Sequence, residues 1–170
     1  MKTIFVDGYN VINSWHGLRE IDTGSLENSR LKLIDILLNY GTYNDYKIFL
    51  VFDGHLQPKS LEKREKISKI LIVVFTKEAE TADSFIERYV NKIGRRSEVL
   101  VVTSDSLVQQ LIFQRGAVRM SSIEFYHEVK KVEDNIRNES ESKHIPKRYT
   151  LEERLDKKTV EKLEKMRRNK

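Results

Sequence analysis

The stretch KIFLVFDG at residues 47–54 sets the fold, because five consecutive apolar residues run directly into an Asp-Gly turn. An uninterrupted apolar run of this length is typical of a strand that is buried on both faces. The same pattern recurs at residues 4–6, 70–75, 99–102 and, more weakly, 117–120. Buried strands of this kind occur in parallel sheets that helices cover on both sides.

Helical patterns fill the gaps between these runs. Apolar residues recur at helical spacing in residues 26–40, 81–93, 105–115 and 121–136, and residues 61–68 form a shorter, charged candidate helix. Ser121 or Ser122 is a possible helix cap, with Glu124 suitably placed for a capping box, and residues 13–24 are expected to form a loop. The alternation of strands and helices predicts an α/β fold with a central, mostly parallel sheet of about five strands.

Composition excludes several classes of protein. The 170 residues fit one domain, and the absence of cysteine excludes disulfide frameworks, thiolate zinc sites and cysteine nucleophiles. No apolar run approaches the roughly 18 residues of a membrane span, and the N-terminus does not resemble a signal peptide. We therefore expect a cytoplasmic protein with no membrane partner.

Charge divides the chain into three predicted parts. Residues 1–137 form an almost neutral domain, residues 138–150 a polar linker, and residues 151–170 a basic tail that we expect to be helical. The tail carries eight of the 31 basic side chains against five acidic ones. A polyanion would be its natural partner, although a solvated helix of mixed charge explains the same composition.

Acidic residues follow every major strand of the predicted sheet. Asp7 and Asp53 come directly after strands, Asp105 lies shortly after another, and Asp83 begins the helix that follows residues 70–75. The carboxyl ends of parallel strands meet at one edge, where ligands bind. Taken singly, each acid has a structural explanation as a turn residue or a helix cap.

Taken together, converging carboxylates repel and raise one another's pKa, and Mg²⁺ or Mn²⁺ would relieve that repulsion. If residues 4–6 form the central strand and residues 70–75 lie to one side, the helix at 81–93 crosses back over the centre. That path would bring Asp83 beside Asp7 and Asp105. The P-loop and dinucleotide motifs are absent, so no nucleotide cofactor is expected, and the four histidines show no metal-ligand spacing.

Five stretches of this sequence resemble the YacP-like branch of the NYN domains. They are VDGYNVI at 6–12, LVFDGH at 50–55, VVFTKEAETADSFIER at 73–88, VVTSD at 101–105 and GAVRMSS at 116–122. NYN domains are PIN-like, metal-dependent ribonucleases, and this branch includes a ribosome-associated endoribonuclease of Bacillus-type bacteria. The resemblance implies a three-layer PIN-like fold and cleavage of RNA that depends on Mg²⁺ or Mn²⁺.

The resemblance also implies roles for individual residues. Asp7, Asp83 and Asp105 match the catalytic, metal-binding acids, Asn10 matches a catalytic amide, and Asp53 is a further candidate ligand. Glu80 matches the same motif, although a structural role at the start of the helix fits it equally well. Nearby hydroxyl groups could support the metal ligands or donate to phosphate; these are Thr81, Thr103 and Ser104.

Basic and aromatic side chains supply the candidate RNA contacts. The candidates are Tyr9, Trp15, Lys59, Lys63, Lys92, Arg95 and Arg96. Aromatic rings stack on unpaired bases and basic groups hold phosphates. The basic residues could equally be solvated helix faces, and Trp15 could be buried beneath its own segment.

The sequence therefore predicts hydrolysis of RNA phosphodiester bonds by metal-activated water, which leaves 5′-phosphate and 3′-hydroxyl ends. The expected partners are RNA, in particular mRNA, and the ribosome. A catalytically silent RNA- or ribosome-binding module of the same fold is the main alternative. A DNA-directed nuclease of the flap or repair kind is a second one, against which the short chain counts because no insertion could form an arch or clamp.

Overall fold

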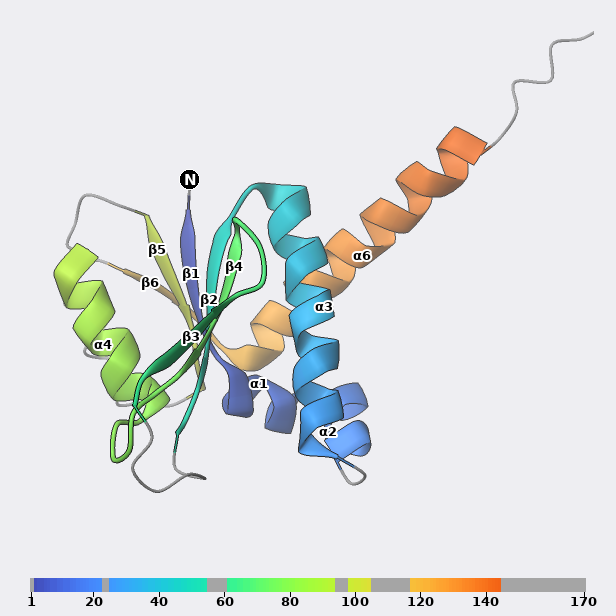
Figure 1. Ribbon diagram of the computed structural model, residues 1–170. Coiled ribbons are helices and arrows are strands. Elements are labelled where there is room, and N and C mark those ends of the chain that lie inside the picture. The colour runs from blue at the N-terminus through green and yellow to red at the C-terminus, as the bar shows by residue number, and fades with distance from the viewer. Residues whose placement is uncertain (1, 23–24, 55–60, 94–97, 105–116, 145–170) are drawn as a thin grey trace, which may run out of the picture. The chain divides into compact units, whose positions relative to one another are not determined.

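The computed structural model describes residues 2–22, 25–54, 61–93, 98–104 and 117–144 (Figure 1). Within these residues a six-stranded sheet has the order β3-β4-β2-β1-β5-β6. The strands are β1 (Thr3–Asp7), β2 (Lys47–Phe52), β3 (Lys63–Lys66), β4 (Leu71–Phe75), β5 (Val99–Val102) and β6 (Val118–Met120). All neighbouring strands are parallel except β3 and β4, so the predicted mostly parallel sheet is confirmed, with one strand more than expected.

The additional strand is β3, and the helix predicted at residues 61–68 is wrong. Lys63 to Lys66 run antiparallel to β4, with Lys63 opposite Phe75 and Lys66 opposite Ile72. As the edge strand of the sheet, β3 is largely exposed and carries only charged side chains. β3 is held in the sheet by hydrogen bonds to β4 and has no apolar face of its own. Hydrophobic periodicity therefore does not predict it.

Helices cover both faces of the sheet (Figure 1). They are α1 (Gly8–Ser14), α2 (His16–Asp22), α3 (Leu26–Asn44), α4 (Ala82–Ile93) and α6 (Ser122–His144). Leu33 of α3 and Phe125 of α6 belong to the core on one face, and Phe85 of α4 belongs to the core on the other. The three layers confirm the predicted fold class.

Several helix boundaries differ from the prediction, and the helix predicted at 26–40 continues to Asn44. Residues 13–24 were expected to form a loop, but Ser14 ends α1 and α2 occupies His16 to Asp22. The helix predicted at 121–136 is present and continues to His144, through the first half of the predicted linker at 138–150. The helix predicted at 105–115 and the tail at 151–170 lie outside the described residues.

The predicted capping box fixes the start of α6. The Ser121 N–H donates to Glu124 Oε2 at 2.7 Å, and the Glu124 N–H donates to Ser121 Oγ at 3.2 Å. These reciprocal bonds satisfy two of the N–H groups that a helix leaves unpaired at its first turn. The chain therefore turns from β6 into α6 at the edge where the parallel strands end.

The chain divides into two compact units, residues 1–136 and residues 137–170. The sheet and both cores belong to the first unit, and residues 137–144 at the end of α6 are the described part of the second. No helix in the described part of the chain has the length and apolar character needed to cross a membrane.

Candidate active site

The order of the strands places the end of β1 at the centre of the candidate site. β1 lies between β2 and β5, and α4 connects β4 on one side of it with β5 on the other. This is the crossing that the sequence predicted. The first turn of α4 and the ends of β1 and β2 consequently meet at one edge of the sheet (Figure 1).

Asp7 is the last residue of β1 and also the N-cap of α1. Its Oδ1 accepts the N–H of Asn10 at 3.1 Å. An N-cap residue needs only a side-chain oxygen, which aspartate and asparagine supply about equally well. The cap therefore explains the side-chain oxygen of Asp7 but not its charge.

Asp53 and Thr81 together fix the start of α4. Asp53 follows β2 directly, and its Oδ1 accepts the N–H of Ala82, the first residue of the helix. Thr81 Oγ1 accepts the N–H of Ser84 at 3.1 Å, as a helix cap does. These bonds hold the first turn of α4, which carries Asp83, against the end of β2.

The carboxylates act on one another electrostatically. The pKa of the Asp7 carboxyl is raised to about 7, mainly by burial and to a smaller extent by the negative charges of Asp83 and Asp53, against hydrogen bonds from the N–H groups of Asn10 and Tyr9. Three segments that are far apart in sequence thus bring three acids to one edge. Asp105, the fourth predicted acid, lies outside the described residues.

The donor chemistry of this edge fits a hard divalent cation. Carboxylate oxygens are the ligands that Mg²⁺ and Mn²⁺ prefer, and a cation would remove the repulsion that helps raise the pKa of Asp7. Among the described residues, which leave out Asp105, no three His, Asp or Glu side chains form a group that could hold a metal ion. A complete set of ligands therefore requires a residue beyond Asp7, Asp53 and Asp83.

Asn10 joins three segments at the same edge. Its Oδ1 accepts the N–H of Ser104 at 3.3 Å and also accepts the hydroxyl of Ser122. Ser104 Oγ in turn accepts the Ser122 N–H at 3.4 Å. The amide oxygen of Asn10 therefore holds the end of β5 and the start of α6 beside α1, and Ser104 is the residue directly before Asp105 in the sequence.

We expect replacement of Asn10 with alanine to lower kcat for the predicted cleavage of RNA about 10- to 100-fold and to leave KM nearly unchanged. The substitution removes the acceptor that positions Ser104, and misplaced catalytic geometry lowers the rate more than it weakens binding. The loss of these two hydrogen bonds, one exposed and one partly buried, should also cost about 1–3 kcal/mol of stability. Steady-state kinetics and thermal denaturation measure both. A raised KM with unchanged kcat would instead mean that Asn10 contacts the RNA.

The remaining polar candidates differ in exposure. Glu80 is only 8% exposed and pairs with Arg88 at 2.9 Å, which favours its structural role. Thr103 is fully buried, and its N–H donates to the Met120 carbonyl at 3.1 Å. Thr81 and Ser104 are exposed at the acidic edge, so their hydroxyls lie closer to solvent than that of Thr103.

The basic candidates do not all lie at this edge. Lys63 is opposite Phe75, the last residue of β4, and so lies at the acidic edge, where it pairs with Glu65 at 2.5 Å. Lys92 lies in the last turn of α4, whereas Asp83 lies in the first. Asp83 and Lys92 are nine residues apart on this helix, a rise of about 14 Å, so Lys92 is remote from the acids. Three candidates lie outside the described residues, namely Lys59, Arg95 and Arg96.

Of the two aromatic candidates, Trp15 is buried. It is 3% exposed, and its Nε1 donates to the Ser122 carbonyl at 2.8 Å. The structure thus selects burial, one of the two roles that the sequence left open, and removes Trp15 as a stacking surface for bases. Tyr9 is half-buried at the acidic edge, with its ring edge-on to Phe52 at 5.0 Å between centroids.

Arg30 of α3 is a neighbour of this edge that the sequence analysis missed. Its guanidinium donates to the Tyr9 hydroxyl and lies against aromatic rings at the strand ends. A signal was present, because Leu26, Arg30, Leu33 and Leu37 share the spacing of one helix face. A charged residue within an otherwise apolar stripe indicates a partly buried cation with a specific environment.

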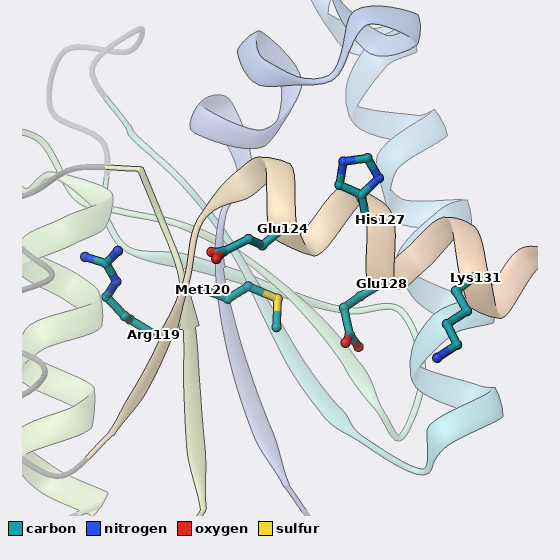
Figure 2. Close-up of a pocket in the computed structure, with 6 residues that line it drawn as sticks. All are labelled: Arg119, Met120, Glu124, His127, Glu128 and Lys131. Carbon is teal, nitrogen blue, oxygen red and sulfur yellow. The ribbon is translucent and has the colours of Figure 1, made fainter.

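A separate cavity of about 460 Å³ lies between β6 and the first turns of α6 (Figure 2). Its lining residues are Arg119, Met120, Glu124, His127, Glu128 and Lys131. Acidic and basic groups alternate around it, and Glu124 is already engaged in the capping box. Asp7, Asp53 and Asp83 do not line this cavity, so the acidic edge remains the candidate active site.

Comparisons with known proteins agree with this architecture. The family described as the YacP-like NYN domain matches residues 4–168. The chain is similar to the protein named Uncharacterized protein YacP of Bacillus subtilis strain 168, with 38% identity over 137 residues, 80% of this chain and 79% of that protein.

Two solved structures are similar to the chain along most of its length. The crystal structure of Rae1 (YacP) from Bacillus subtilis has a TM-score of 0.72 and 34% identity, and covers 99% of this chain and 95% of that one. The crystal structure of a mutant of the same Bacillus subtilis protein has a TM-score of 0.73 and 32% identity, with 89% of each chain covered. On the extent of the family match and the identity to these relatives, the chain belongs to the YacP-like NYN domain family.

Proposed function

We propose that this protein is a divalent-metal-dependent endoribonuclease that hydrolyses RNA phosphodiester bonds. The observation that carries the proposal is the acidic edge, where Asp83 and Asp53 help to raise the pKa of Asp7 to about 7. A fold that keeps repelling carboxylates together at the strand ends is expected to use them with a cation. Membership of the NYN family supports a nuclease-like function directed at RNA.

Each acid has a distinct task in this proposal. Asp7, Asp83 and Asp105 would hold Mg²⁺ or Mn²⁺, and Asp53 would act mainly by fixing the first turn of α4 through the Ala82 N–H. The bound ion supplies a water of lowered pKa and neutralises charge on the phosphate. Asn10 holds Ser104 in place, so that the residue after it can complete the set. Hydrolysis by water leaves a 5′-phosphate and a 3′-hydroxyl.

We further propose that the substrate is mRNA on the ribosome in the cytoplasm, with a part in mRNA decay. The support is the sequence of residues 151–170, which contains eight basic and five acidic side chains. Such a tail adds affinity for a polyanion without taking part in the chemistry.

The test is incubation of the purified protein with a structured RNA and with translating ribosomes, with and without Mg²⁺, followed by mapping of the RNA ends. We expect cleavage only with Mg²⁺, with 5′-phosphate ends, and none by Asp83→Asn. If the protein binds RNA but cleaves it under none of these conditions, it is a catalytically silent binding module. Ends that carry a 2′,3′-cyclic phosphate would contradict attack by water.

A further inference from the structure

Arg30 lies against three aromatic rings at the ends of the strands. Its guanidinium carbon is 5.3 Å from the ring centroid of Tyr9, 5.4 Å from that of Phe52 and 5.7 Å from that of Phe75. Phe52 ends β2, Phe75 ends β4, and Tyr9 follows β1 by two residues. The guanidinium therefore lies at the same edge of the sheet as the acids.

Arg30 reaches this edge from the α3 face of the sheet, and the first turn of α4, which carries Asp83, reaches it from the other face. The rings of Tyr9, Phe52 and Phe75 pack with the core on the α3 face. Asp53 bonds instead to the first residue of α4, which covers the other face. Figure 1 shows that α3 and α4 both begin at this edge, one on each side. A strand of RNA that crosses the edge at the acids would leave it beside Arg30.

Within the described residues, the charge of Arg30 is only weakly compensated. The side chain is 17% exposed, and its ion pair in the described structure is to Glu27 at 3.3 Å, whose own side chain is 68% exposed. Exposed ion pairs contribute little to stability and exchange readily with other anions. Arg30 Nε is buried and has no hydrogen-bond partner among the described residues. Buried donors are ordinarily satisfied, so the Nε donor of Arg30 lacks an acceptor in the described part of the chain.

We propose that Arg30 binds an RNA phosphate next to the one that is cleaved, an inference that rests on the proposed function. A guanidinium donates to phosphate oxygens in one plane, and the rings and the Tyr9 hydroxyl hold this one in a fixed orientation. The phosphate would displace the exposed Glu27 carboxylate. The Tyr9 ring, half-buried at the same edge, would contact the adjoining nucleotide.

The test measures binding of a single-stranded RNA oligonucleotide in chelator, at several salt concentrations, so that no metal or cleavage is involved. Arg30→Met keeps an apolar stem against the rings and removes the charge. We expect an affinity about tenfold weaker, as for a lost hydrogen bond to a charged group. We also expect the slope of log K against log salt to fall by about 0.7.

Arg64→Met is the matched control. Arg64 also lies against a ring, 5.0 Å from the centroid of Tyr89, but its charge is paired with Glu62 at 2.5 Å. We expect this variant to bind RNA with unchanged affinity and salt slope. Arg30→Lys keeps the charge and should fold like the wild type. It should retain the salt slope yet bind about threefold more weakly, because an ammonium group lacks the planar fork.

Wild-type affinity and slope in Arg30→Met, with only the melting temperature lowered, would overturn the inference and leave Arg30 as a structural cation. If Arg30→Met does not fold, wild-type affinity in Arg30→Lys would overturn it. The proposed function is tested separately. Cleavage by the wild type in Mg²⁺ together with unchanged binding by Arg30→Met would reject the Arg30 site alone. The absence of cleavage by the wild type would reject the nuclease.

Discussion

Asp7→Asn is expected to abolish RNA cleavage, by at least about a thousandfold, while the protein remains folded. Asparagine keeps the side-chain oxygen that accepts the Asn10 N–H, so the cap of α1 should survive. It removes the central negative charge of the acidic edge, and with it one proposed ligand of the metal. Removal of electrostatic stabilisation at a reacting phosphate typically costs about 10²- to 10³-fold per group, and loss of the metal costs more.

The same substitution should stabilise the metal-free protein at pH 8. The pKa of Asp7 is raised from 3.8 to about 7, mainly by burial, so ionisation of Asp7 opposes folding. The folded state holds this proton more tightly than the unfolded chain. The stabilisation from the proton is therefore complete below about pH 4 and is lost as the pH rises through about 7. We expect the free energy of unfolding of Asp7→Asn to exceed that of the wild type by about 2 kcal/mol at pH 8. This difference corresponds to a Tm that is higher by about 5 °C.

Thermal denaturation in chelator between pH 5 and pH 8 measures this effect. The difference in Tm between Asp7→Asn and the wild type should grow steadily with pH. Asp35→Asn is the control, because Asp35 is exposed on α3 and away from the acidic edge. A folded Asp7→Asn protein that cleaves RNA at the wild-type rate would end the metal-nuclease proposal. A pH-independent Tm difference would show that the charge of Asp7 is not buried as described.

The central parallel strands were predictable because each contains an uninterrupted apolar run. Residues 48–52 and 99–102 are buried at every position. Burial of successive residues means that both faces of the strand are covered, and this is why both faces carry apolar side chains. β3 was not predictable in this way, because KREK contains no apolar residue and takes its conformation from hydrogen bonds to β4. Edge strands of this kind are specified by the neighbouring strand.

The approach of Asp83 to Asp7 was predictable from topology alone. Once β1 is central and β4 lies to one side, a helix between β4 and β5 must pass the end of β1. The position of Trp15 was not predictable, because its partner, the Ser122 carbonyl, is 107 residues away in sequence. Residue type favours neither of the two roles for such an aromatic. Only the tertiary contact decides that it is buried.

Arg30 was missed for a related reason. Charged residues on helices are usually solvated, and a single arginine among 31 basic side chains gives no signal from composition. What distinguishes it is the set of rings contributed by three other segments, after β1 and at the ends of β2 and β4. The candidate acids are indicated by the strand ends, whereas the environment of Arg30 arises from packing between elements.

Gly8→Ala should be strongly destabilising. Gly8 follows Asp7 and faces the ring of Phe52, and a Cβ built at this position would lie 2.3 Å from Phe52 Cε1 and 2.6 Å from Cδ1. The ring is fully buried and has little room to move, since Tyr9 lies 5.0 Å away and Phe75 lies 5.7 Å away between centroids. Overpacking of this kind costs about 1–3 kcal/mol, and the better helix propensity of alanine recovers less than about 1 kcal/mol.

The displacement should also reach the chemistry, because Gly8 adjoins Asp7 and Phe52 adjoins Asp53. A shift of either carboxylate by about 1 Å can lower the rate about a hundredfold, so cleavage should fall together with Tm. Gly17→Ala is the matched control, since a Cβ there has no neighbour within 4 Å and its position in α2 favours alanine. That variant should melt at or slightly above the wild type and cleave RNA normally. Equal Tm values for the two variants would mean that the Phe52 ring moves aside without cost. The close contact between Gly8 and the Phe52 ring would then not hold the acidic edge in place.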